Sequence, residues 1–111
     1  MKKRYRIKRN EEFQDIIQKG KSLAGRGFVI YYRDAVFATN DRVGISVGKK
    51  VGNAVERNKV KRQVRAMVRD ITEFKNGKDT IIIVRKGYSG RSFEDNKKEL
   101  LKLYQSVYNN I

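Results

Sequence analysis

Apolar residues recur at helical spacing in three segments of the chain. The spacing predicts helices over residues 10–19 and 54–71 and a last helix that opens at Ser92. The residues that form the three apolar stripes are Phe13, Ile16 and Ile17; Val60, Val64, Met67, Val68 and Ile71; and Phe93, Leu100, Tyr104, Val107 and Ile111. Asn10, Asn53 and Ser92 stand where N-cap side chains are expected. We therefore predict three amphipathic helices.

Other segments have the features of β-strands. Residues 27–33 alternate between two faces, and Arg42–Val47 forms a second strand after a connection from Asp34 to Asp41. Asp79–Arg85 contains the β-branched run TIIIV, which is typical of a strand buried on both faces. A short extra strand is expected near Ser22-Leu23. The alternating residues of the first long strand are Phe28, Ile30 and Tyr32 on one face and Val29, Tyr31 and Arg33 on the other.

These elements predict one α+β domain that covers residues 1–111, in the order α-β-β-β-α-β-α. A chain of 111 residues has the length of one domain and leaves no room for a second. The chain has no Cys and no His, so thiolate zinc sites, cysteine nucleophiles and histidine bases are excluded. Protein-borne hydrolytic or metal chemistry is therefore not expected.

The charge is strongly basic and is concentrated in two segments. Lys and Arg number 27 against 12 Asp and Glu, for a net charge of +15. Residues 1–10 hold 6 bases and no acid, and residues 47–69 hold 8 bases against the single Glu56. Such clustering indicates a polyanionic partner. No secretory signal and no apolar run long enough for a membrane helix is present, so we expect a cytoplasmic protein without a membrane partner.

The predicted helix over residues 54–71 carries a basic face beside its apolar stripe. Its cationic and amide residues span about 140° of a helical wheel at 100° per residue; they are Arg57, Asn58, Lys61, Arg62, Arg65 and Arg69. Lys49 and Lys50 lie just before this helix. Solvated helix faces normally mix charges of both signs, so the pattern favours contact with nucleic-acid phosphates. Composition alone leaves DNA and RNA both open.

The segment Gly44–Arg65, GISVGKKVGNAVERNKVKRQVR, resembles the signature of the bacterial ribonuclease P protein component. In that family a strand ending in SV-x-KK leads through G-x-AV into a helix that opens with RN-x-x-KR-x-x-R. The matching residues are Ser46, Val47, Lys49, Lys50, Gly52, Ala54, Val55, Arg57, Asn58, Lys61, Arg62 and Arg65. Lys86-Gly87-Tyr88 stands where the family often has a proline, which is the one departure.

The resemblance implies an α/β sandwich with a left-handed β-α-β crossover and a defined set of partners. The catalyst would be ribonuclease P RNA, which uses bound Mg²⁺ to remove the 5′ leader of precursor tRNA in a 1:1 holoenzyme. The protein would supply no catalytic residue, no metal ligand and no organic cofactor site. The implied contacts to the RNA subunit are Lys49, Arg57, Asn58, Lys61, Arg62, Arg65 and Arg69. A cleft between the sheet and the first helix would bind the single-stranded leader.

Residues for this leader cleft follow from the predicted faces. Phe13 and Ile17 share a helix face, and Val29 and Tyr31 share a strand face. Lys50 and Arg57 would close one end of the cleft. An aromatic ring beside cations suits stacking on unpaired bases. Tyr31 is favoured over Phe13 for this role, because a hydroxyl suits a wet position.

Three other functions remain open at this point. The first is a ribosomal or chaperone-like RNA-binding protein with no catalytic partner, which would not distinguish precursor from mature tRNA. The second is a protein-only nuclease that uses an acid such as Asp15. The third is a DNA-binding helix that reads the major groove. Glu11 and Glu12 are interpreted as helix-start residues rather than as a metal site.

Overall fold

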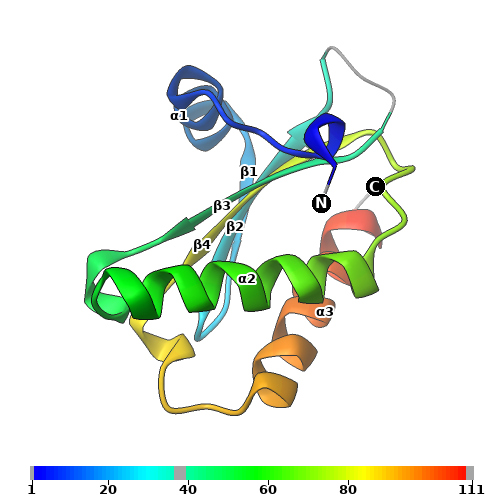
Figure 1. Ribbon diagram of the computed structural model, residues 1–111. Coiled ribbons are helices and arrows are strands. Elements are labelled where there is room, and N and C mark those ends of the chain that lie inside the picture. The colour runs from blue at the N-terminus through cyan, green and yellow to red at the C-terminus, as the bar shows by residue number, and fades with distance from the viewer. Residues whose placement is uncertain (1, 37–39, 110–111) are drawn as a thin grey trace.

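A four-stranded mixed sheet separates one helix from the other two in the computed structural model, which describes residues 2–36 and 40–109 (Figure 1). Helix α1 lies on one face of the sheet, and α2 and α3 lie on the other. The elements in chain order are η1 (Lys3–Tyr5), α1 (Asn10–Lys19), β1 (Lys21–Ala24), β2 (Phe28–Asp34), β3 (Arg42–Val47), η2 (Lys49–Val51), α2 (Ala54–Ile71), β4 (Lys78–Val84), η3 (Lys86–Tyr88) and α3 (Phe93–Asn109).

The strands lie in the order β1-β2-β4-β3. Both β1 and β4 pair with β2 in antiparallel fashion, whereas β3 and β4 are parallel. Parallel neighbours need a crossover connection, and α2 supplies it between β3 and β4. The fold is therefore the predicted single α+β domain, with the predicted element order and a β-α-β unit. The bounds predicted for β3 and α2 are confirmed, and β4 begins and ends one residue earlier than predicted.

Alternation along the strands divides the interior into two cores. Phe28, Ile30 and Tyr32 of β2 are buried on the face covered by α2 and α3, as predicted. In the central strand β4, Ile82 packs into this larger core, while Ile81 packs with Ile16 of α1 into a smaller one. The prediction that the β-branched run is a strand with both faces covered is therefore confirmed.

Two of the three predicted caps are present. The Asn53 side chain accepts a hydrogen bond from the Glu56 amide at 2.9 Å, and Ser92 Oγ accepts one from the Asp95 amide at 3.1 Å. The predicted Asn10 cap is wrong, because Asn10 is already the first residue of α1 and Arg9 is the N-cap, without a capping side chain. The extended N-terminal segment before α1 is hydrogen-bonded to β3 through the Ile7 amide and the Val43 carbonyl. Ile111, expected on the stripe of α3, lies outside the described residues.

Asp41 joins the ends of three elements at the edge of the larger core. Its buried carboxylate accepts hydrogen bonds from Thr72 Oγ1 at 3.1 Å, from Tyr108 Oη at 3.1 Å and from the Lys78 amide at 2.8 Å. Burial raises the pKa of Tyr108 to about 12, so this phenol stays a donor at neutral pH. The contacts fix the C-terminal ends of α2 and α3 against the start of β4, and so hold α2 against the sheet.

Candidate nucleic-acid interface

The basic face predicted for α2 is present and lies open to solvent. Asn58, Arg62 and Arg69 are exposed, while Arg57, Lys61 and Arg65 are half-buried along the same face. Lys49 and Lys50 are exposed on η2, immediately before the helix. Among the described residues, none of these cations forms an ion pair with a carboxylate. Their mutual repulsion is therefore not offset within the protein, and an anionic partner would relieve it.

Arg57 differs from the other cations of α2 in its packing. Its Nε atom is buried and has no hydrogen-bond partner among the described residues. A buried donor without an acceptor destabilises the protein by roughly 1–3 kcal/mol. Arg57 lies in the first turn of the helix, next to the exposed Asn58. The start of α2 thus presents polar groups that the protein itself does not satisfy.

A groove of about 460 Å³ runs between α1 and the β3 side of the sheet. Phe13 and Ile17 of α1 form part of its apolar wall, and Lys61 of α2 is a cation in its lining. The remaining lining residues are Ile7, Lys8, Asn10, Gln14, Ile45, Ser46, Val47 and Ile83. Apolar surface with cations at its margin suits a single strand of nucleic acid, whose bases stack and whose phosphates are charged.

A glycine in β3 allows Phe13 to lie directly on the sheet. A Cβ atom at Gly44 would come within 2.5 Å of Phe13 Cζ and 2.8 Å of Ile81 Cδ1. Any larger residue at this position would therefore displace the ring. The half-buried Phe13 packs against the small core that includes Ile16 and Ile81. The phenyl ring is in this way both a core residue and part of the groove wall.

Buried charges hold α1 over the sheet. Asp79 of β4 is fully buried and accepts two hydrogen bonds from Arg42, each at 3.0 Å, and one from Arg33 at 3.4 Å. Arg42 reaches Glu12 of α1 at 2.7 Å, and Arg33 pairs with Asp15 of the same helix. We name these five residues the α1 clamp. The clamp ties two successive turns of α1 to the buried carboxylate of β4.

The electrostatic consequences fit this arrangement. Hydrogen bonds from Lys19 and Arg33 lower the pKa of Asp15, and hydrogen bonds to Asp79 and Glu12 raise the pKa of Arg42, although burial opposes the latter shift. Both shifts favour the charged forms of Asp15 and Arg42. Glu12 does more than favour the helix start, the role that local sequence assigns to it. The sequence feature that could have indicated the clamp is Asp79, a single carboxylate at the start of an apolar strand. A buried carboxylate requires a cationic partner, so its position calls for nearby arginine or lysine side chains.

The structure brings together only some of the residues predicted for the leader cleft. Phe13 and Ile17 line the groove, as predicted. Tyr31 is on the same side of the sheet and packs against the small core. Among the described residues, Val29, Tyr31 and Lys50 are not part of the groove lining, and Lys61 is the α2 cation that reaches it. Phe13 is thus the aromatic residue among the groove lining, and Tyr31 packs on the same small core as Phe13.

Within residues 2–36 and 40–109, no three carboxylate, His or Cys side chains gather closely enough to hold a metal ion. The carboxylates of the clamp are instead neutralised by Arg33, Arg42 and Lys19. No helix in the described part of the chain is long and apolar enough to cross a lipid bilayer. The described surface thus offers cations and an apolar groove, and the clamp carboxylates are already paired.

Comparisons with known proteins agree on one family. The sequence profile of the family Ribonuclease P matches residues 1–108. The ribonuclease P protein component of Bacillus cereus (strain AH187) is 46% identical over 106 residues, which cover 95% of this chain and 92% of that protein. A Staphylococcus aureus RNase P protein mutant, described as defective in mRNA degradation activity, superposes with a TM-score of 0.88 at 38% identity, covering 95% of this chain and 89% of that one. The RNase P protein of Thermotoga maritima gives a TM-score of 0.77 at 31% identity, covering 96% of each chain.

Proposed function

The chain belongs to the ribonuclease P protein component family, the protein subunits of a tRNA-processing endoribonuclease, and from this we propose that it binds two RNAs on two surfaces. The basic face of α2 binds the ribonuclease P RNA. The groove beside α1 binds the single-stranded 5′ leader of precursor tRNA. Cleavage is carried out by the RNA subunit in a 1:1 holoenzyme, in the bacterial cytoplasm where precursor tRNA is made.

The unpaired cations of α2 are the observation that supports the first contact. Arg62 and Arg69 project from an exposed helical surface and have no carboxylate partner among the described residues. Guanidinium groups bind phosphate oxygens in bidentate fashion, and a rigid helix spaces them along an RNA backbone. The structured RNA subunit offers phosphates at many positions, which suits a surface that reads charge rather than base identity.

The apolar wall of the groove supports the second contact. Phe13 and Ile17 offer stacking and apolar surface to unpaired bases, which a duplex does not expose. Lys8 and Lys61 supply charge for the phosphates of the same strand. A single-stranded leader offers both unpaired bases and phosphates, and mature tRNA has no leader. The groove thus gives the protein a means of preferring the precursor.

Mg²⁺ belongs to the RNA side of this proposal. The described residues offer no metal-binding cluster, and Glu12 and Asp15 of α1 are held in ion pairs. The metal, when bound by the RNA subunit, supplies a polarised water and stabilises the charge that develops on the phosphate. The role of this chain is to neutralise phosphates nearby and to orient the leader, which lowers the Mg²⁺ concentration that the RNA requires.

Replacing Phe13 by alanine is expected to reduce the preference for precursor over mature tRNA. Loss of stacking on one base is worth roughly 1–3 kcal/mol, so precursor affinity of the holoenzyme should fall about fivefold to a hundredfold. Affinity for mature tRNA should stay the same. Leu101→Ala is the matched control, since Leu101 is 40% exposed on α3, away from the groove. Equal losses for precursor and mature tRNA would contradict a leader-binding groove.

The Staphylococcus aureus relative raises a second activity, because its mutant is described as defective in mRNA degradation. A protein-only nuclease would need an available acid or base on this chain. Asp15, the acid that the sequence suggests, is paired with Lys19 and Arg33, and these contacts lower its pKa and make it a weaker base. The geometry therefore favours catalysis by the RNA subunit. Incubation of the purified protein alone with RNA tests this directly.

A further inference from the structure

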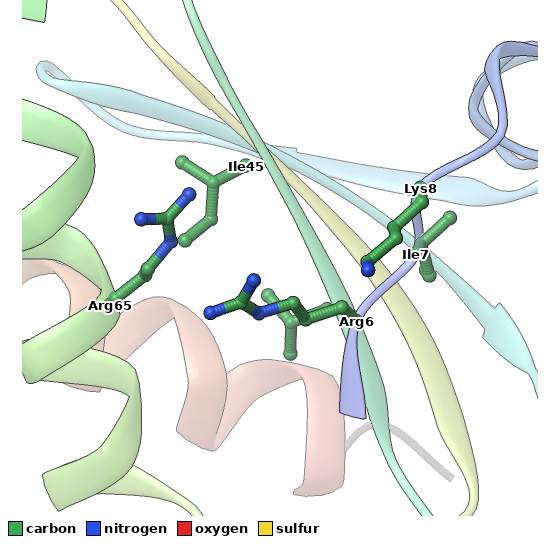
Figure 2. Close-up of a pocket in the computed structure, with 6 residues that line it drawn as sticks. Arg6, Ile7, Lys8, Ile45 and Arg65 are labelled. Atoms are coloured by element: carbon green, nitrogen blue, oxygen red, sulfur yellow. The ribbon is translucent and has the colours of Figure 1, made fainter. Parts of the chain in front are cut away.

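A second basic pocket, of about 130 Å³, adjoins the groove between the N-terminal segment and α2 (Figure 2). Arg6 and Lys8 enter it from the N-terminal segment, Ile45 from β3 and Arg65 from α2. In Figure 2 the three cationic side chains point into the same space from two different elements. Arg65 is the only one of these pocket residues that belongs to the matching residues of the family signature. The signature therefore does not describe this pocket.

The N-terminal cations of this pocket sit on a fixed backbone. The amide of Ile7 donates to the carbonyl of Val43 at 3.0 Å, and the Ile7 side chain is 4% exposed in the small core. Upstream, Tyr5 stacks on Phe74 with ring centroids 4.4 Å apart. Anchors on both sides of Arg6 mean that its position is set by the fold. A partner that binds there does not have to order a free chain end.

The cations of the pocket are not neutralised by the protein. No acidic residue lines it, and within the described residues none of Arg6, Lys8 and Arg65 forms an ion pair. The Nε atom of Arg6 is buried and has no hydrogen-bond partner there. Three converging positive charges repel one another, so the arrangement destabilises the free protein.

A comparable basic pocket near the C-terminal end of α1 shows the contrast. It is lined by Lys19, Lys21, Arg33 and Lys78, and all of these cations except Lys21 pair with Asp15 or Asp34. Most of its positive charge is therefore neutralised within the chain. The difference singles out the pocket of Arg6, Lys8 and Arg65 as one that an external anion would complete.

We propose that this pocket binds one backbone phosphate of the RNA strand that occupies the groove, an inference that rests on the proposed function. Ile7, Lys8 and Ile45 line both the groove and the pocket, so the two spaces are adjacent. A strand with bases against Phe13 would pass Lys8 and place its next phosphate between the two guanidinium groups. Guanidinium groups suit the non-bridging oxygens of a phosphodiester, which accept hydrogen bonds from more than one side. The pocket would thereby fix the register of the strand in the groove.

The test uses the full-length protein and single-stranded oligonucleotides in which one linkage at a time is a neutral methylphosphonate. Wild-type protein should lose about tenfold in affinity at one linkage and much less at its neighbours. The Arg6→Gln/Lys8→Gln variant should bind the unmodified oligonucleotide at least about tenfold more weakly than the wild type. Neutralising the linkage to which the wild type is sensitive should cause no further loss of affinity in this variant. The slope of log Kd against log salt should fall by about 0.7 for each phosphate that the variant no longer neutralises.

Lys2→Gln/Lys3→Gln is the matched control, because it removes the same charge from the same segment outside the pocket. This control variant, like the wild type, should lose about tenfold in affinity at one methylphosphonate linkage and much less at its neighbours. If the wild type binds single strands but loses the same affinity at every methylphosphonate linkage, the phosphate-binding role of the pocket is contradicted. The proposed function is not affected by that result. No binding of single strands by the wild type would contradict both. If inorganic phosphate stabilised only the wild type while both proteins bound the oligonucleotide equally, the pocket would hold a free anion, and the assignment to RNA would be overturned.

Discussion

Asp79→Ala is expected to lower the free energy of unfolding by about 3 kcal/mol, because it breaks a buried ion pair. The Asp79 carboxylate is fully buried between Arg33 and Arg42. Its removal leaves two nearly buried guanidinium groups without their shared acceptor. The effect is at the lower end of the range for broken buried pairs, because Glu12 and Asp15 still pair with the two arginines. A loss of this size is a large part of the total stability of a small domain.

Urea unfolding at neutral pH, followed by circular dichroism, measures this change. Asp34→Ala is the control, since the Asp34 carboxylate is 86% exposed although it contacts Lys78 at 2.6 Å. That surface pair should contribute less than about 1 kcal/mol. If the two variants unfold at the same urea concentration, Asp79 does not hold the fold in the way described.

The α1 clamp also connects stability to function. Glu12→Gln removes only the ion pair between α1 and Arg42, and it leaves Asp79 and its two arginines in place. It should therefore leave the overall fold intact but loosen the helix wall that carries Phe13. We expect weaker discrimination between precursor and mature tRNA with a small change in stability. Unchanged discrimination would mean that the clamp does not position the groove.

Arg62→Ala/Arg69→Ala is expected to weaken binding to ribonuclease P RNA by at least a hundredfold at about 0.1 M salt. A hydrogen bond to a charged group is worth about 1.5–3 kcal/mol, and each substitution removes one guanidinium that binds a phosphate. The slope of log K against log salt should become shallower by about 0.7 to 0.9 for each phosphate that is no longer bound. Filter binding or fluorescence anisotropy across a salt series measures both quantities.

Lys98→Ala/Lys102→Ala on α3 removes the same net charge from another exposed helical surface. This control should leave both affinity and salt slope close to those of the wild type. If both double variants lose affinity equally, net charge and not the face of α2 determines binding. The specific role assigned to this helix would then be contradicted.

Local patterns in the sequence predicted the elements that have strong periodicity. The 18 residues of α2 combine an apolar stripe with the Asn53 cap, and the bounds of the helix follow from these two features. The alternation in β2 correctly separated residues such as Ile30 from residues such as Tyr31. The basic face of α2 could also be predicted from the sequence, because it depends only on the spacing of residues within one helix.

Features that depend on contacts between segments distant in sequence could not be predicted from local sequence patterns. The segment before α1 is held against β3 by a hydrogen bond from Ile7 to Val43, and Asn10 lies inside the first turn of α1 instead of capping it. Phe13 occupies the groove because Gly44, distant in sequence, leaves space beneath its ring. The clamp joins α1 to three strands, so its charges appear unrelated along the chain. In each case tertiary contacts decide the outcome, and local propensity does not.

Cleavage of 5′-labelled precursor tRNA by a bacterial ribonuclease P RNA at low Mg²⁺, with and without this protein, tests the central claim most directly. The account predicts that the protein restores cleavage at the mature 5′ end and is inactive when incubated with the substrate alone. Binding to the RNA without restored cleavage would contradict the account in favour of a general RNA-binding protein. Cleavage by the protein alone would contradict the assignment of catalysis to the RNA subunit.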